Sequence, residues 1–162
     1  MNKKVLILLS LFLILSITIF ITYSLSKEAI NVQRETLENE EIILRSGEIE
    51  IILKREDLSA DSEDFEAVLD TSTTKASTHK YKGAQLKNIL SKNNLDVKDK
   101  GVIILTGVDG YAVAYSAEEV LQENNVYIAY IEDEKYISYQ SIIRSDMFSN
   151  RRCKWLTKIE VK

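Results

Sequence analysis

Few side chains in this sequence could do chemistry, and the first to consider are its one histidine, His79, and its one cysteine, Cys153. One cysteine and one histidine cannot build a Cys/His zinc site, and no spacing of Asp and Asn resembles a calcium loop. A histidine that acts as a general base needs a nucleophile or an orienting carboxylate within reach, and no sequence pattern around His79 provides one. We therefore predict no metal ligand and no catalytic residue, and we expect His79 at the surface or in a structural hydrogen bond.

The surroundings of Cys153 allow two interpretations. The neighbouring cations Arg151, Arg152 and Lys154 would lower the pKa of the thiol and make it reactive. Its position beside Trp155, in the approach to the last predicted strand, instead indicates a buried cysteine that packs within the sheet. We favour the buried cysteine, and a single cysteine also excludes an intramolecular disulfide.

The elements that must position these side chains are organised around residues 101–130. Two apolar runs, at residues 102–105 and 111–115, flank a turn that ends in Asp109 and Gly110. An Asp-Gly pair tolerates positive φ, which favours a tight connection between antiparallel strands. The pattern predicts a β-hairpin.

A short helix and another strand are predicted to follow this hairpin. Ser116 and Glu119 have the spacing of a capping box, in which the Ser hydroxyl accepts a hydrogen bond from a free amide and the Glu side chain reaches back to the cap. The two asparagines at positions 124 and 125 should end the helix. The apolar run at residues 126–131 then predicts a strand.

The flanking segments add further strands and one more helix. Short apolar or alternating runs between turn residues predict strands over residues 42–44, 49–53, 65–69, 136–143 and 155–161. A helix is predicted over residues 84–92, because Leu86, Ile89 and Leu90 fall on one face at helical spacing. The expected fold class is α+β, a strand-rich mixed-sheet domain with two or three short helices over residues 41–162.

The amino terminus carries a different signal. After Lys3 and Lys4, residues 5–26 contain no charged side chain and are mostly Leu, Ile, Val and Phe. At about 1.5 Å per residue, a helix of this length crosses a hydrocarbon core of about 30 Å. We predict a membrane anchor over residues 1–26 and a polar stalk over residues 27–40. The positive-inside rule then predicts a single-pass protein of the cell membrane with its C-terminal domain extracytoplasmic; the alternative is a domain secreted after signal-peptide cleavage.

Charge argues against one class of partner. The formal net charge is −4 and no stretch is strongly basic. Nucleic-acid binding depends on a basic face that contacts phosphates. We therefore expect no nucleic-acid partner. The membrane, through the N-terminal helix, is the expected partner, together with a protein or small molecule that the sequence does not identify.

Three segments together resemble the molybdopterin-binding oxidoreductase domain, which has the sulfite-oxidase-like fold. The segments read YKGAQLKNIL at residues 81–90, TGVDGY at residues 106–111 and KWLTKIEV at residues 154–161. The resemblance covers residues 41–162 and implies that fold, with molybdopterin as the cofactor of its enzymes. Arg151 aligns with a basic cofactor-contacting position. The resemblance makes Arg151, Arg152 and His79 the candidate cofactor-binding residues.

The sequence departs from this family where the metal is held. The family's enzymes bind molybdenum through a cysteine shortly before the Tyr-x-Gly segment, and here residues 70–74 read DTSTT. Residues 137–141 also lack the family's Gly-x-Pro-x-Arg pattern. A hydroxyl is a poor substitute for a soft thiolate ligand, and a phosphate needs fixed cationic donors. The resemblance therefore implies the fold more than the activity.

We interpret the chain as a membrane-anchored extracytoplasmic binding or interaction domain of molybdopterin-oxidoreductase-like fold without molybdenum chemistry. This interpretation leans away from an enzyme and from any bound cofactor. The alternatives are a small molybdopterin-dependent redox protein, with Arg151 and Arg152 on the cofactor's phosphate, and an accessory subunit of a membrane redox complex.

Overall fold

The computed structural model describes residues 11–23, 41–95, 97, 101–132 and 137–162. The chain divides into two compact units, Met1–Glu35 and Thr36–Lys162. In the first unit, residues 11–23 form a helix whose side chains are all exposed. No helix in the described part of the chain combines the length and the apolar character that a membrane span requires. Of the anchor predicted over residues 1–26, residues 1–10 and 24–26 lie outside the described residues, and so does the whole stalk predicted over residues 27–40.

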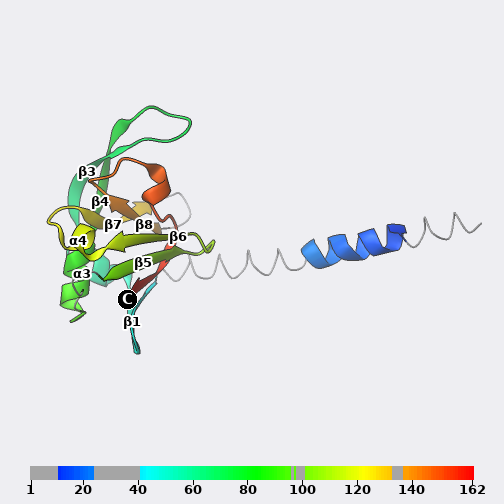
Figure 1. Ribbon diagram of the computed structural model, residues 1–162, viewed down its shortest axis with the longest axis horizontal. Helices are drawn as coiled ribbons and strands as arrows, with labels where there is room; N and C mark the ends of the chain where they lie inside the picture. Colours follow the sequence, from blue (N-terminus) through cyan, green and yellow to red (C-terminus); the bar gives the residue numbers. More distant parts are fainter. Residues whose placement is uncertain (1–10, 24–40, 96, 98–100, 133–136) are drawn as a thin grey trace, which may run out of the picture. The chain divides into compact units, whose positions relative to one another are not determined.

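The second unit contains two β-sheets (Figure 1). A five-stranded sheet has the order β2-β1-β9-β5-β6, and a four-stranded sheet has the order β3-β4-β7-β8. β1 and β9 run parallel, and the other neighbouring strands run antiparallel. The strands are β1 (Ile42–Ser46), β2 (Ile49–Leu53), β3 (Glu63–Leu69), β4 (Ser77–Gln85), β5 (Val102–Gly107), β6 (Ala112–Ser116), β7 (Val126–Glu132), β8 (Ile137–Ile143) and β9 (Leu156–Val161).

Three short α-helices and one 3₁₀ turn connect these strands: α2 (Arg55–Ser59), α3 (Leu86–Lys92), α4 (Ala117–Leu121) and η1 (Ser149–Arg151). The predicted capping box is present at α4, where the Ser116 hydroxyl accepts the Glu119 amide at 3.2 Å and the Glu119 carboxylate accepts the Ser116 amide at 2.9 Å. Asn124, at φ 55°, lies just beyond the helix. The α+β class, the mixed sheet and the short helices of residues 41–162 are confirmed.

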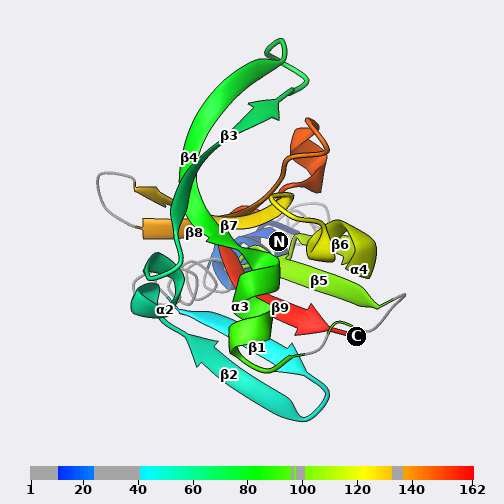
Figure 2. The same cartoon turned by 90° about the vertical axis from the view of Figure 1, so that its left-hand side faces the viewer.

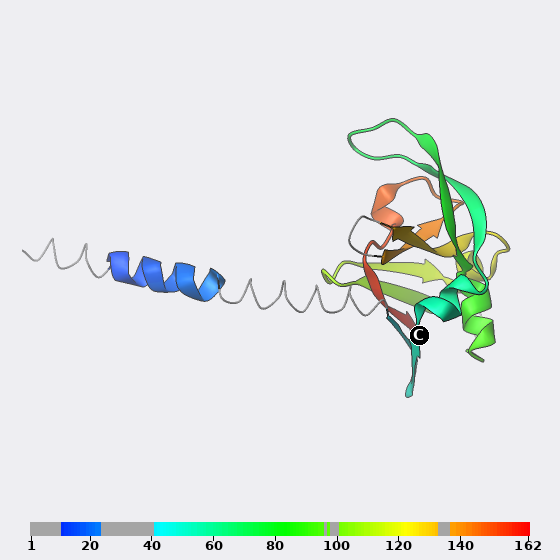
Figure 3. The ribbon, with the colours of Figure 1, turned by 180° about the vertical axis from the view of Figure 1, so that it is seen from behind.

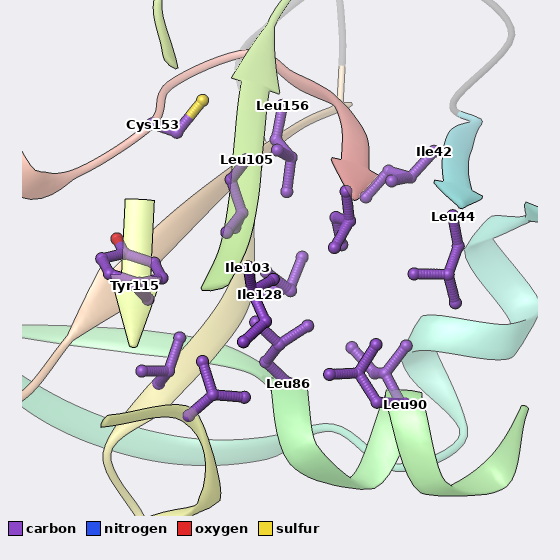
Figure 4. Packing of buried hydrophobic residues seen from close by; sticks show 14 of the residues in the cluster. Ile42, Leu44, Leu86, Leu90, Ile103, Leu105, Tyr115, Ile128, Cys153 and Leu156 are labelled. Carbon is purple, nitrogen blue, oxygen red and sulfur yellow. The ribbon is translucent and has the colours of Figure 1, made fainter. Parts of the chain in front are cut away.

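The main hydrophobic core lies between the two sheets and α3 (Figure 4). Leu86 of α3, Leu105 of β5, Ile128 of β7 and Leu156 of β9 are each no more than 2% exposed. Burying a large apolar side chain contributes roughly 1.5–3 kcal/mol, so this cluster is the main source of stability. A smaller cluster contains Phe65, Ala67, Tyr127, Ala129 and Ile142, with Tyr81 packed against it.

Two boundaries differ from the sequence prediction. The helix predicted over residues 84–92 begins at Leu86, because Ala84 and Gln85 pair with β7 and extend strand β4. The last strand begins at Leu156, because Trp155 has φ 48° and is 46% exposed, so it stands outside the ladder. At residues 84 and 85 pairing with a distant strand decides the backbone conformation, whereas at Trp155 the positive φ delays the start of the strand.

Candidate binding groove

Strands β3 and β4 form a long hairpin that curves away from the rest of its sheet (Figures 2 and 3). We call this hairpin the arm, residues 63–83. β4 pairs with β3 along the whole arm but with β7 only from Gly83 to Gln85. At Gly83 a Cβ atom would lie 2.3 Å from the Ile128 carbonyl oxygen and 2.6 Å from the Ala129 Cα. Only glycine permits this approach, so Gly83 is the point from which β4 leaves β7.

An open groove of about 640 Å³ lies where the arm leaves the sheet, lined by residues of β3, β4 and β7. Aromatic side chains contribute to its lining, and charged side chains of both signs do so as well. Among the lining residues are Phe65, Glu66, Lys80, Tyr81 and Tyr130. A groove with aromatic and charged walls suits an elongated ligand that has both apolar and charged groups.

Arg152 and His79, two of the predicted site residues, contact the same tyrosine of this groove. Arg152 is 3% exposed; it donates to the Tyr81 hydroxyl at 2.9 Å and to the Val68 carbonyl, and its guanidinium carbon lies 5.6 Å from the Tyr81 ring centroid. The Arg152 Nε has no hydrogen-bond partner among the described residues. The ring of His79 lies 6.3 Å from that of Tyr81, and its Nε2 is 2.9 Å from the Ser77 hydroxyl. His79 is exposed and hydrogen-bonded, as predicted.

Arg151, the third predicted residue, has a different set of neighbours. Its guanidinium binds both oxygens of Glu119, at 2.7 and 3.2 Å, and lies 3.4 Å from an Asp146 oxygen. Its carbon lies 5.4 Å from the Tyr115 ring centroid. The hydrogen bond from Arg151 lowers the pKa of Glu119, which keeps that carboxylate ionised. The charge of Arg151 is therefore already balanced within the fold.

Cys153 belongs to a buried polar network that fixes the segment before β9. Its amide donates to the Ser141 hydroxyl at 2.9 Å, and Ser141 also bonds the Tyr115 hydroxyl at 2.8 Å. Burial raises the pKa of Cys153 to about 12 and that of Tyr115 to about 12. Cys153 is fully buried, which confirms the buried-cysteine interpretation, and its raised pKa disfavours the thiolate that a reactive cysteine needs at neutral pH.

The donor groups of this fold do not suit a molybdenum cofactor. The one thiol is buried, and burial holds its pKa at about 12, whereas a metal ligand must be a thiolate. In the loop aligned with the family's cysteine, the Thr71 hydroxyl bonds the hydroxyls of Thr73 and Thr74. Within the described residues there is no group of three or more His, Cys, Asp and Glu side chains that could hold a metal. Arg151, the expected phosphate contact, is bound to Glu119.

Sequence reasoning missed Gly83 and Ser141 as organising residues. An isolated glycine inside a strand is a signal of close backbone approach, but Gly83 looked like the lead-in to a helix because the strand character of the polar residues before it was not recognised. Ser141 had no local signal, since its partners lie 26 and 12 residues away in sequence.

Comparison with known proteins supports the fold and no finer assignment. No family model matches the chain, and no curated protein is similar to it in sequence. Among solved structures it is similar to the sulfane dehydrogenase SoxCD from Paracoccus pantotrophus, with a TM-score of 0.61 and 13% sequence identity. The match covers 76% of this chain and 38% of the SoxCD chain, so this chain spans well under half of that protein. The domain therefore has a fold distantly similar to that of part of the SoxCD chain.

Proposed function

We propose that the chain is a membrane-anchored, extracytoplasmic binding domain, built on a molybdopterin-oxidoreductase-like fold that no longer performs molybdenum chemistry. The observation that carries this proposal is the groove beside the arm. It is open, about 640 Å³ in volume and lined by aromatic and charged side chains. The residues expected to hold a cofactor are meanwhile bound to other parts of the fold.

The side chains of residues 11–23 support the membrane anchor. Large apolar side chains of this helix project on all sides, and Phe12 and Phe20 are each 70% exposed. A helix that is apolar on all sides has no polar face to present to water. The hydroxyls of Ser16 and Thr18 donate to the carbonyls four residues earlier, at 2.9 and 2.8 Å. The Thr22 hydroxyl likewise donates to the Thr18 carbonyl, so the Ser and Thr hydroxyls of residues 11–23 all have partners within the helix.

Cell fractionation tests the location directly. We would express the full chain with a C-terminal tag, separate membranes from soluble fractions and treat intact spheroplasts with protease. The proposal predicts that the tag remains with the membranes in high salt and is removed by external protease. Recovery of the tag in the soluble fraction, or its protection from external protease, would contradict it. The intact mass of the purified chain distinguishes an anchor from a secreted, cleaved form.

The similarity to SoxCD supports a second candidate function, that of a small molybdopterin-dependent redox protein. In that case Arg152, which is buried and has no carboxylate partner among the described residues, would be the remaining cation for a phosphate. Absorbance bands from a pterin or a metal, lost in an Arg152→Ala variant that still folds, would favour this candidate over the binding domain.

A further inference from the structure

The outer edge of the arm is covered by the segment that follows β8. Arg144 donates to the Glu66 carbonyl at 3.1 Å, and Arg152 donates to the Val68 carbonyl. The amide of Asp70 donates to the carbonyl of Met147 in the same covering segment at 2.8 Å. The carbonyl of Asp70 accepts a hydrogen bond from the amide of Ser149 at 3.2 Å. These contacts show that the main-chain groups of every second β3 residue point away from β4.

The direction of these groups determines which main-chain groups of β4 face the groove side. In an antiparallel pair, opposite residues alternate between pairs that share hydrogen bonds and pairs that do not. Glu66 lies opposite Lys80 and Val68 lies opposite Thr78. Because Glu66 and Val68 turn their carbonyls outward, both pairs are of the kind that shares no hydrogen bonds. The amides and carbonyls of Thr78 and Lys80 therefore point away from β3, toward the edge of β4 that pairs with β7 further along the strand.

No described strand meets these groups. The pairing of β4 with β7 ends at Gly83 and Ala129, and the arm curves away beyond that point (Figure 2). The fold therefore covers one edge of the arm with arginines and leaves the other open beside the groove. An open strand edge offers donors and acceptors at a spacing that an extended polypeptide backbone matches.

From this arrangement we infer that the groove binds an extended acidic peptide segment of a partner protein, which adds as a strand to the open edge of β4 at Thr78 and Lys80. The inference rests on the proposed binding function and names its ligand class. Tyr81 and Tyr130 line the groove and offer aromatic surface to the apolar side chains of the peptide.

Charge is the reason for an acidic segment. Lys80 lines the groove, is exposed and forms no ion pair with the described residues. A side chain directly opposite it on an added strand would lie about 5 Å away. Asp64 and Glu66, the acidic residues of the lining, lie on β3, which is about 10 Å from an added strand by strand spacing, so salt screens their repulsion. An acidic residue opposite Lys80 therefore gains more from the lysine than it loses to Asp64 and Glu66.

The test uses the full chain in detergent and a phage library of short random peptides. We expect enrichment of peptides with carboxylates at alternate positions. Lys80→Ala removes the charge and keeps the amide, and should weaken the selected peptides about threefold. Lys80→Pro also removes the amide that faces the groove, and should weaken them by a further factor of about ten. Thermal unfolding of both variants checks that the arm remains folded.

A second measurement does not depend on any variant. In hydrogen exchange, the amides of Thr78 and Lys80 should exchange fast in the free chain and become protected by a selected peptide. Failure to enrich any peptide would overturn the inference. Peptides that bind equally well to Lys80→Pro and leave both amides unprotected would also overturn it, while the chain would remain a binding domain. The fractionation experiment fails or succeeds independently of both outcomes.

Discussion

Replacing Gly83 by alanine tests the contact from which the arm diverges. The added Cβ would lie 2.3 Å from the Ile128 carbonyl oxygen and 2.6 Å from the Ala129 Cα. Both are main-chain atoms of β7, so no side chain can turn aside to relieve the overlap. Ordinary contact would require the two strands to separate by roughly 1 Å. Gly83 has no positive φ, so alanine suits its backbone and the cost is steric alone.

The expected cost is at the upper end of the range for overpacking, about 3 kcal/mol. The separation would disturb the whole β4–β7 pairing, because its register contains only Gly83 to Gln85 opposite Tyr127 to Ala129. For a domain of this size, such a loss lowers the Tm by roughly 10 °C. Thermal unfolding of the full chain in detergent, followed by circular dichroism, measures it.

Gly47→Ala is the matched control. Gly47 lies in a hairpin turn at φ 59°, and no atom lies within 4 Å of the Cβ that alanine would add there. Its cost is conformational and should be about 1 kcal/mol. If Gly83→Ala unfolds no earlier than Gly47→Ala, the strands are not in the close contact described here and the account of the arm is wrong.

Three further predictions concern the cap of α4, the ion pair of Glu119 with Arg151, and the burial of Cys153. Ser116→Ala removes the hydroxyl that caps α4 and should cost about 1 kcal/mol in urea unfolding; an unchanged midpoint would show that the capping box is not formed. Because the hydrogen bond from Arg151 lowers the pKa of Glu119, the stabilisation from this pair is present above the unfolded pKa of about 4.3 and is lost as the pH falls through the lower folded pKa. The wild type should thus be more stable than Glu119→Gln at neutral pH and converge with it in acid, and a constant difference at every pH would refute the pair. Burial raises the pKa of Cys153 to about 12, so a thiol reagent at pH 8 should label the unfolded chain far faster than the folded one; equal rates would contradict its burial.

The parts of the fold that follow from local chemistry could be predicted from the sequence. The hairpin was predicted from a turn signal at Asp109 and Gly110 between two apolar runs, and its strands pair as expected. The cap formed by Ser116 and Glu119 depends on residues three apart, and such a contact can be seen without a fold. The interpretation of Cys153 as a buried residue also followed from its immediate neighbours.

The parts that depend on distant strands could not be predicted. Residues 77–82 are almost entirely polar, yet they form most of β4 because β3 pairs with them along their whole length. The contact of Arg152 with Tyr81 spans 71 residues, and that of Arg151 with Glu119 spans 32. The two adjacent arginines thus have different roles: Arg152 contacts Tyr81 of the groove, and Arg151 forms an ion pair with Glu119. No pattern around residues 151 and 152 distinguishes them.

The molybdenum content of the purified chain tests the central claim most directly. The full chain should be produced in cells that make the molybdenum cofactor, purified in mild detergent and analysed for molybdenum by mass spectrometry. A scaffold whose one thiol is buried, with its pKa raised to about 12, and whose Arg151 is bound to Glu119 should contain far less than one molybdenum per chain. One molybdenum per chain, retained through gel filtration, would contradict the proposal that this domain binds a partner without molybdenum chemistry.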